Sequence, residues 1–115
     1  AWILPRHIGL SRAAQLFYTG EVINASTALE WGLVSEVVEE NELIPRASQI
    51  ANQIAEQPPQ ALRMTKKMMR DSMTTSFENT MEISAALQVT LQNTEDHMEA
   101  VNAFFEKRKP IFKGC

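Results

Sequence analysis

The amino-acid sequence predicts a mainly α fold, with about six helices and one short strand. Three observations support this fold class. Apolar residues recur at helical spacing along most of the 115 residues, residues that favour helix starts precede these segments, and Gly or Pro follows several of them. Only one run, residues 33–38, is rich in Val and too short for a helix, so it is predicted to be the strand.

The N-terminal third is predicted to hold two helices and this strand. The first helix begins after Gly9 and ends at Thr19-Gly20, and its apolar face is formed by Leu10, Ala13, Ala14 and Phe17. A short helix over residues 25–31 follows. Asn24 is its natural N-cap, and Gly32 supplies the left-handed residue after it.

Two further helices are predicted in the middle of the chain. Asn41 is expected to cap the third helix, with Pro45 in the first turn, where a missing N–H costs little. The fourth helix begins at Pro59, after the break at Pro58-Pro59, and runs to about Met73. Its inward residues are predicted to be Leu62, Thr65 and Met69.

The opposite side of the fourth helix carries a basic stripe, defined here as Arg63, Lys66, Lys67 and Arg70. These residues share one helical face because they are spaced by three and four positions. The stripe is interpreted either as a solvated face or as a contact with an anionic ligand or partner.

The last two helices are predicted from their caps. Thr75 and Glu78 have capping-box spacing, which predicts a helix to about Gln92. Asn93 and Thr94 then precede the terminal helix, which Pro110 ends. Acidic residues stand in its first turn and cations near its end, as the helix dipole favours: Glu95, Asp96, Lys107, Arg108 and Lys109.

Phe104 and Lys107 are the candidate binding residues, since an aromatic ring and an ammonium lie three residues apart. Two interpretations are open. The terminal helix is either a cap that docks on a core and exposes a charged tip, or a clamp for a ligand with an aromatic head and phosphates.

Composition narrows the function classes. The formal net charge of −3 argues against a general nucleic-acid binder, and no apolar run approaches the roughly 20 residues that cross a bilayer. Cys115 is the only cysteine, which excludes an internal disulfide and a cysteine metal site and fits a reducing, cytoplasmic compartment. His7 and His97 are expected to be surface or cap residues, so no metal site is predicted. No catalytic motif is present.

Ordered short motifs resemble the enoyl-CoA hydratase/isomerase (crotonase) family. Each motif is weak alone, but together they cover nearly the whole chain in the family's order. The N-terminal motifs are Leu4-Pro5-Arg6-His7-Ile8-Gly9, Arg12-Ala13-Ala14, Thr19-Gly20, Ile23-Asn24-Ala25, Ala28, Gly32-Leu33-Val34 and Val37-Val38. The later ones are Leu43, Ala51, Ile54-Ala55, Pro58-Pro59, Ala61-Leu62, Thr65-Lys66, Thr94, Asp96-His97, Glu99, Ala103-Phe104, Glu106-Lys107-Arg108, Pro110 and Phe112.

The resemblance implies the helical C-terminal region of a ββα-spiral α/β enzyme. Residues 1–38 would end the core, and residues 39–115 would form a helical region for trimer contacts and CoA contacts. The family stabilises a thioester enolate in an oxyanion hole and either adds water to an enoyl-CoA or shifts its double bond, as in fatty-acid β-oxidation. The catalytic residues would precede Ala1, so this chain is expected to contain none and to be inactive alone.

By the same resemblance, Phe104 and Lys107 would contact the CoA of an acyl-CoA substrate held by a neighbouring subunit, with Lys107 near the phosphates. No cofactor is implied, because CoA is part of the substrate. The expected assembly is a homotrimer or a dimer of trimers, with no nucleic-acid or membrane partner, and the choice between hydratase and isomerase stays open. The rival hypothesis is a stand-alone helical interaction or oligomerisation module, against which the apolar start Trp2-Ile3-Leu4 speaks.

Overall fold

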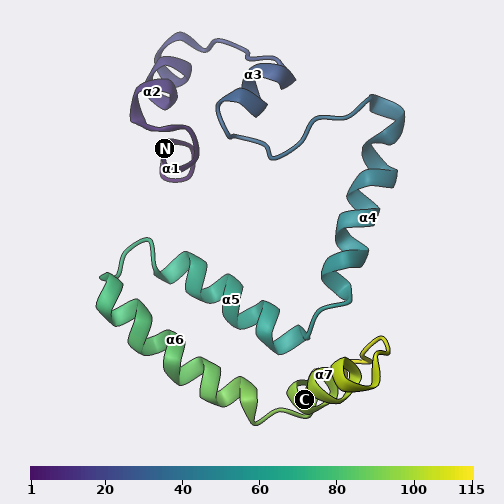
Figure 1. Cartoon of the computed structure of the whole chain (residues 1–115). Helices are drawn as coiled ribbons and strands as arrows, with labels where there is room; N and C mark the ends of the chain where they lie inside the picture. The colour runs from purple at the N-terminus through teal and green to yellow at the C-terminus, as the bar shows by residue number, and fades with distance from the viewer. The chain divides into compact units, whose positions relative to one another are not determined.

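The computed structural model describes residues 1–115 and is 68% helical with no strand, which confirms the mainly α prediction. It divides into two compact units, Ala1–Arg46 and Ala47–Cys115, which are described in turn. The functional division expected between residues 38 and 39 stays a prediction. Figure 1 labels the helices: α1 Leu4–Ile8, α2 Leu10–Thr19, α3 Ala25–Glu30, α4 Leu43–Ala55, α5 Pro59–Asp71, α6 Phe77–Gln92 and α7 Glu95–Glu106, with a 3-10 turn at Glu40–Glu42.

The first unit begins with a helix that the sequence analysis did not predict. Helix α1 spans only Leu4–Ile8 and has a proline in its first turn, where the missing N–H leaves no helical bond unmade. Gly9 joins α1 to α2 at φ 82°, and its N–H donates to the carbonyl of Pro5. The two helices pack together, and Ile8 and Ala13 are buried.

Helix α2 confirms its predicted start and stop, and α3 confirms its predicted start but ends at Glu30, one residue before the predicted end. Gly20 ends α2 in the left-handed region, at φ 66°. The side chain of Asn24 accepts a hydrogen bond from the Thr27 N–H at 2.8 Å, which makes it the N-cap of α3. Gly32 has a φ of 75° just beyond that helix.

The strand predicted over residues 33–38 does not form, and this part of the prediction was wrong. The N–H groups of Leu33 and Val34 both donate to the carbonyl of Ala28, at 2.9 and 3.4 Å, and so close α3. A strand needs the backbone of a second strand to pair with, and the chain contains none. The Glu36 side chain instead forms an ion pair with Arg46 at 2.8 Å.

Helix starts differ from prediction at two places. Asn41 does not cap the third predicted helix, because it lies inside the 3-10 turn that runs directly into α4. The N-cap of α6 is Ser76, whose Oγ accepts from the Asn79 N–H at 3.2 Å, one position later than the predicted Thr75. In both cases several adjacent polar residues were able to cap, and sequence alone did not choose between them.

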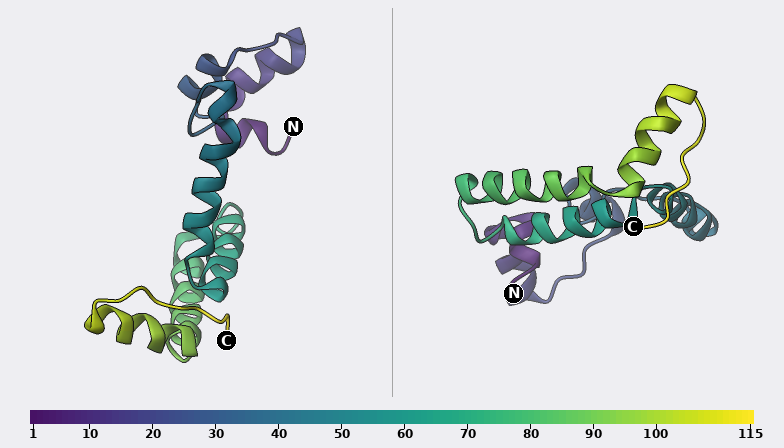
Figure 2. Two further views of the ribbon diagram at one scale, coloured as in Figure 1. Left: turned by 90° about the vertical axis from the view of Figure 1, so that its right-hand side faces the viewer. Right: turned by 90° about the horizontal axis from the view of Figure 1, so that it is seen from below.

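In the second unit, α5 and α6 lie side by side and run in opposite directions (Figure 2). Thr65 and Met69 of α5 are exposed, with Met69 at 66%, so two of the three predicted inward positions were wrong. Met64 and Met68 are half-buried instead. Met68 lines the contact with α6, which shows that the packed stripe is rotated by one residue from the predicted one.

Few apolar side chains are buried in either unit. The buried ones are Ile8, Ala13, Ala28 and Ala103. Many large apolar side chains are more than half exposed, among them Trp2, Ile3, Phe17, Val22, Met69, Phe77 and Phe104. Most large apolar side chains in this chain therefore keep part of their surface exposed, which limits what their burial contributes to stability.

The identity of the α6 cap gives a stability prediction. Ser76→Ala removes the acceptor for the Asn79 N–H and is expected to lower the free energy of unfolding by about 0.5–2 kcal/mol. Thr75→Val is the matched control, because it removes a hydroxyl that caps nothing and keeps the side-chain shape. Urea unfolding followed by circular dichroism measures both variants. A larger destabilisation by the Thr75 variant would contradict the assignment of Ser76.

Candidate functional site

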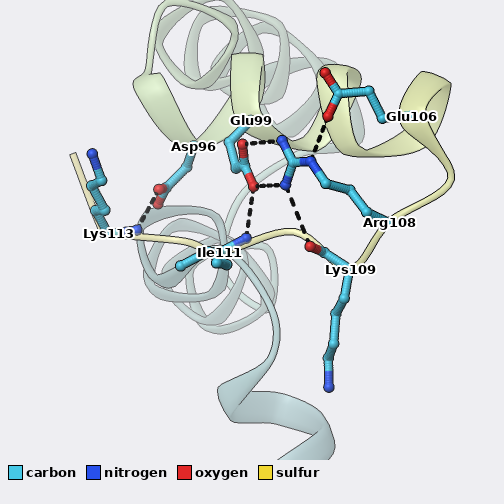
Figure 3. A network of polar contacts seen from close by, with 7 residues as sticks. All are labelled: Asp96, Glu99, Glu106, Arg108, Lys109, Ile111 and Lys113. Carbon is cyan, nitrogen blue, oxygen red and sulfur yellow. Dashed lines mark hydrogen bonds and ion pairs between the residues drawn. The ribbon is translucent and has the colours of Figure 1, made fainter.

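Helix α7 and the residues after it form the most heavily bonded part of the second unit. Thr94 is the N-cap of α7, as predicted: its Oγ1 accepts from the His97 N–H at 3.2 Å and donates to the Leu91 carbonyl at 2.6 Å. Residues 107–115, here called the C-terminal tail, turn back along α7 (Figures 2 and 3). The tail is held by two carboxylates of the helix, Asp96 and Glu99.

Asp96 is buried, with 2% of its surface exposed, and it is satisfied entirely by the tail. Its Oδ1 accepts from the Lys113 N–H at 2.7 Å and its Oδ2 from the Gly114 N–H at 2.9 Å (Figure 3 shows the first of these bonds). In return, the Asp96 N–H donates to the Cys115 carbonyl at 3.2 Å. The free N–H at the start of α7 thereby finds a partner, as each buried backbone donor requires.

Glu99 holds the middle of the tail. Its two oxygens accept from Nη1 and Nη2 of Arg108 at 2.5 and 2.8 Å, and Oε1 also accepts from the Ile111 N–H at 2.8 Å (Figure 3). The Arg108 guanidinium also donates to Glu106 at 2.5 Å. The hydrogen bonds from Arg108, and then that from Ile111, lower the pKa of Glu99 to about 2. The hydrogen bonds to Glu99 and then to Glu106 raise the pKa of Arg108 above its usual value.

Two longer contacts connect the tail to other helices of this unit. The Gln60 side chain donates to the Gly114 carbonyl at 2.9 Å, which brings the tail against the start of α5. The Lys109 ammonium pairs with Glu56, just after α4, at 2.5 Å. Both partners of this ion pair are exposed and keep much of their hydration, so this second contact contributes little to stability.

Lys107 lies at the boundary between α7 and the tail rather than inside the helix as predicted. Helix α7 ends at Glu106, and Lys107 has φ 54° and ψ 38°, the only non-glycine residue with a positive φ. The Arg108 N–H donates to the Ala103 carbonyl at 3.0 Å, the six-to-one bond that closes a helix when the intervening residue is left-handed. This conformation costs a residue with a Cβ atom roughly 1–2 kcal/mol, so glycine usually occupies it.

The two candidate binding residues are both on the surface. Phe104 is 79% exposed and packs edge-on against the Phe105 ring, with the ring centroids 5.7 Å apart. Lys107 is exposed and forms no ion pair. The ring and the ammonium are not in cation–π contact, since the contacts of that kind are Arg6 over Trp2 and Arg12 over Trp31. Their role in CoA binding stays a prediction.

A pocket of about 380 Å³ lies between α7 and the tail, but it includes neither Phe104 nor Lys107. Its lining carries three carboxylates, Glu95, Asp96 and Glu99, against one lysine, Lys113. A negatively charged lining does not suit phosphates. The exposed surface beyond the end of α7 therefore remains the candidate contact for an anionic ligand.

The basic stripe of α5 lies apart from this site. All four residues are exposed, but Asp71 pairs with Lys67 and lies 4.0 Å from Arg70. The hydrogen bond from Lys67 lowers the pKa of Asp71. Asp71 thus offsets part of the positive charge, which favours the solvated interpretation of the stripe.

No group of three or more His, Cys, Asp and Glu side chains is arranged to hold a metal ion. None of the helices is both long enough and apolar enough to span a bilayer. The network around Asp96, Glu99 and Arg108 was not predicted as a unit. The three-residue spacing of the two carboxylates was the available signal, since it places both on one face of α7.

Comparison with known proteins identifies the family. A family model described as enoyl-CoA hydratase/isomerase matches residues 1–115. The chain belongs to the enoyl-CoA hydratase/isomerase family. This confirms the resemblance found in the sequence and the mainly α character expected for this part of the fold.

Individual members of the family show the same relationship. The chain is 38% identical over 112 residues to (E)-benzylidenesuccinyl-CoA hydratase of Thauera aromatica, covering 97% of this chain and 44% of that protein. It is 39% identical over 109 residues to crotonyl-CoA hydratase of Syntrophomonas wolfei, covering 95% and 42%. The crystal structure of an enoyl-CoA hydratase from Bacillus anthracis superposes with a TM-score of 0.93 at 37% identity, covering 97% and 43%. The chain spans less than half the length of these family members.

The pKa of Glu99 gives a pH prediction. Its value of about 2 in the folded chain lies below the ordinary 4.5, so the ionised carboxylate stabilises the fold above pH 4.5. This contribution is expected to fall away as the pH drops from 4.5 towards 2. Glu99→Gln should flatten that part of the stability profile, as measured by urea unfolding at a series of pH values. An unchanged acid limb would contradict the role of Glu99.

Proposed function

We propose that this chain is the helical C-terminal part of an enzyme that adds water to an enoyl-CoA or shifts its double bond. The match of the family model to residues 1–115 carries the proposal. The reaction passes through a thioester enolate held by backbone N–H donors, and carboxylates move the protons. Residues that precede Ala1 in the whole enzyme supply both the backbone N–H donors and the proton-transferring carboxylates.

The state of the carboxylates supports a catalytic centre elsewhere in the enzyme. Asp96 and Glu99, the two carboxylates of the 380 Å³ pocket that face the tail, are engaged by tail N–H groups and Arg108. A proton-transferring carboxylate works best with a pKa near the working pH, whereas that of Glu99 is lowered to about 2. The structural engagement of these groups fits a supporting role for this chain.

The exposed end of α7 is proposed as a CoA contact. The Lys107 ammonium pairs with the CoA phosphates, and the Phe104 ring offers a face to the nucleotide base. Both side chains are exposed, and Lys107 has no competing carboxylate. CoA enters as part of the substrate, and no further cofactor is needed.

Oligomerisation is part of the proposal, in the form of a trimer or a dimer of trimers in the cytoplasm. The many large apolar side chains that are more than half exposed, such as Trp2, Phe17 and Phe77, support extensive packing against further protein surface. That surface is supplied by the rest of the enzyme and by neighbouring subunits. The same exposure speaks against a stand-alone helical module.

The location of the catalytic residues is tested by activity. The 115-residue chain alone is expected to show no hydration or isomerisation of enoyl-CoA thioesters, whereas the longest form of the protein that contains it turns them over. Steady-state assays with crotonyl-CoA and a 3-enoyl-CoA measure both reactions and also separate hydratase from isomerase. Turnover by the 115-residue chain alone would contradict the proposal.

The CoA contact is tested by charge reversal. Lys107→Glu in the longest form is expected to raise KM for the CoA ester about threefold to fivefold at low salt and less at high salt, because exposed ion pairs are weak and screened. Lys113→Glu is the matched control, since it reverses the charge of an exposed tail lysine without changing its N–H bond to Asp96. An unchanged KM at both salt concentrations would remove Lys107 from the site.

A further inference from the structure

Three cations follow one another at the end of α7, but the structure treats them differently. Arg108 is held by Glu99 and Glu106, and Lys109 by Glu56. Lys107 alone forms no ion pair and is exposed. Lys107 is therefore the only one of these three cations without a carboxylate partner.

The backbone of Lys107 is held in its unfavourable left-handed conformation from both sides. On the helix side, its N–H donates to the carbonyls of Ala103 and Phe104. On the tail side, the next residue is fixed because the Arg108 N–H donates to Ala103 while its guanidinium binds Glu99 through two hydrogen bonds. A residue with a Cβ atom keeps such a conformation only when its surroundings impose it.

The Arg108–Glu99 pair is suited to this task by its geometry. The planar guanidinium meets the carboxylate through two parallel bonds, which fix direction as well as distance. Glu99 also accepts from the Ile111 N–H (Figure 3). One carboxylate therefore holds the tail at two residues that follow Lys107 in the chain, Arg108 and Ile111. The Arg108 guanidinium is already paired with two carboxylates, so it adds little attraction for an anionic ligand.

We propose that Arg108 and Glu99 are positioning residues, whose pairing fixes Lys107 in the left-handed conformation that presents its ammonium to an anionic phosphate ligand. This rests on the proposed function, because the ligand is the phosphate-bearing part of CoA. Fixing the backbone beforehand reduces the conformational freedom that Lys107 gives up on binding. A negative residue, Glu99, therefore promotes the binding of a negative ligand.

The positioning role and simple attraction between charges predict different effects of two substitutions on CoA binding. Glu99→Gln removes a negative charge near the site and keeps an acceptor for the Ile111 N–H, so attraction alone would tighten CoA binding. Arg108→Lys keeps the charge and removes the planar fork, so attraction alone would change nothing. Positioning expects both variants to bind CoA more weakly.

The experiment measures the dissociation constant of CoA by calorimetry on the longest form of the protein that contains this chain. Glu99→Gln and Arg108→Lys are each expected to weaken binding about threefold, as Lys107→Gln does, because each variant removes the benefit of a single exposed ion pair. Glu95→Gln is the charge-matched control: it removes an exposed carboxylate from the same helix and leaves Arg108 untouched. It should not weaken binding.

Glu99→Gln and Arg108→Lys are each then combined with Lys107→Gln, which removes the ammonium that the pair would position. Neither Glu99→Gln nor Arg108→Lys should weaken binding further there. Further weakening, or tighter binding by Glu99→Gln in the parent protein, would overturn the positioning role and leave the CoA contact standing. An unchanged dissociation constant in Lys107→Gln alone would overturn the CoA contact and the positioning role with it.

Discussion

The second unit depends on one buried carboxylate. Asp96 lies in the first turn of α7, where the helix dipole favours its charge, and it is shielded from water by the tail that it binds. A buried charge is tolerated only when hydrogen bonds replace its hydration. Two tail N–H groups do so, which means that the tail cannot leave without exposing the carboxylate and breaking both bonds. Gln60, at the start of α5, donates to the Gly114 carbonyl, so the docked tail also contacts that helix.

Tail closure and helix termination support each other. Helix α7 stops at Glu106 because Lys107 turns left-handed, and that turn sends Arg108 back towards Glu99. Pro110 follows shortly after and excludes a helical continuation. The backbone cost at Lys107 is thus offset by contacts that lie several residues away on both sides. Such an arrangement sacrifices some stability at one residue to fix its place, which is common at functional positions.

Sequence reasoning succeeded where structure depends on neighbouring residues. The cap of α3 at Asn24, the glycine stops at positions 20 and 32, and the cap of α7 at Thr94 each involve partners within a few positions. The family was also found from ordered motifs. Reasoning failed where the partners lie far apart in the sequence. The end of α7 at Glu106 depends on the contact of Arg108 with Glu99, nine positions away. The docking of the tail depends on contacts between Asp96 and residues 17 and 18 positions away. The strand failed for the same reason, since its partner had to come from elsewhere.

The position of Cys115 links the reactivity of its thiol to the docking of the C-terminal tail on α7. Its carbonyl is bonded to the start of α7, while desolvation and the nearby Glu95 carboxylate raise the pKa of its exposed thiol. The thiolate is the form that attacks electrophiles, so a docked tail keeps this sulfur comparatively unreactive at neutral pH. Detachment of the tail would remove this desolvation and the nearby Glu95 carboxylate, so the pKa of the thiol would return towards its ordinary value and alkylation would be faster. As the only sulfhydryl in the chain, it is a built-in reporter whose alkylation rate follows the opening of the tail without any introduced label.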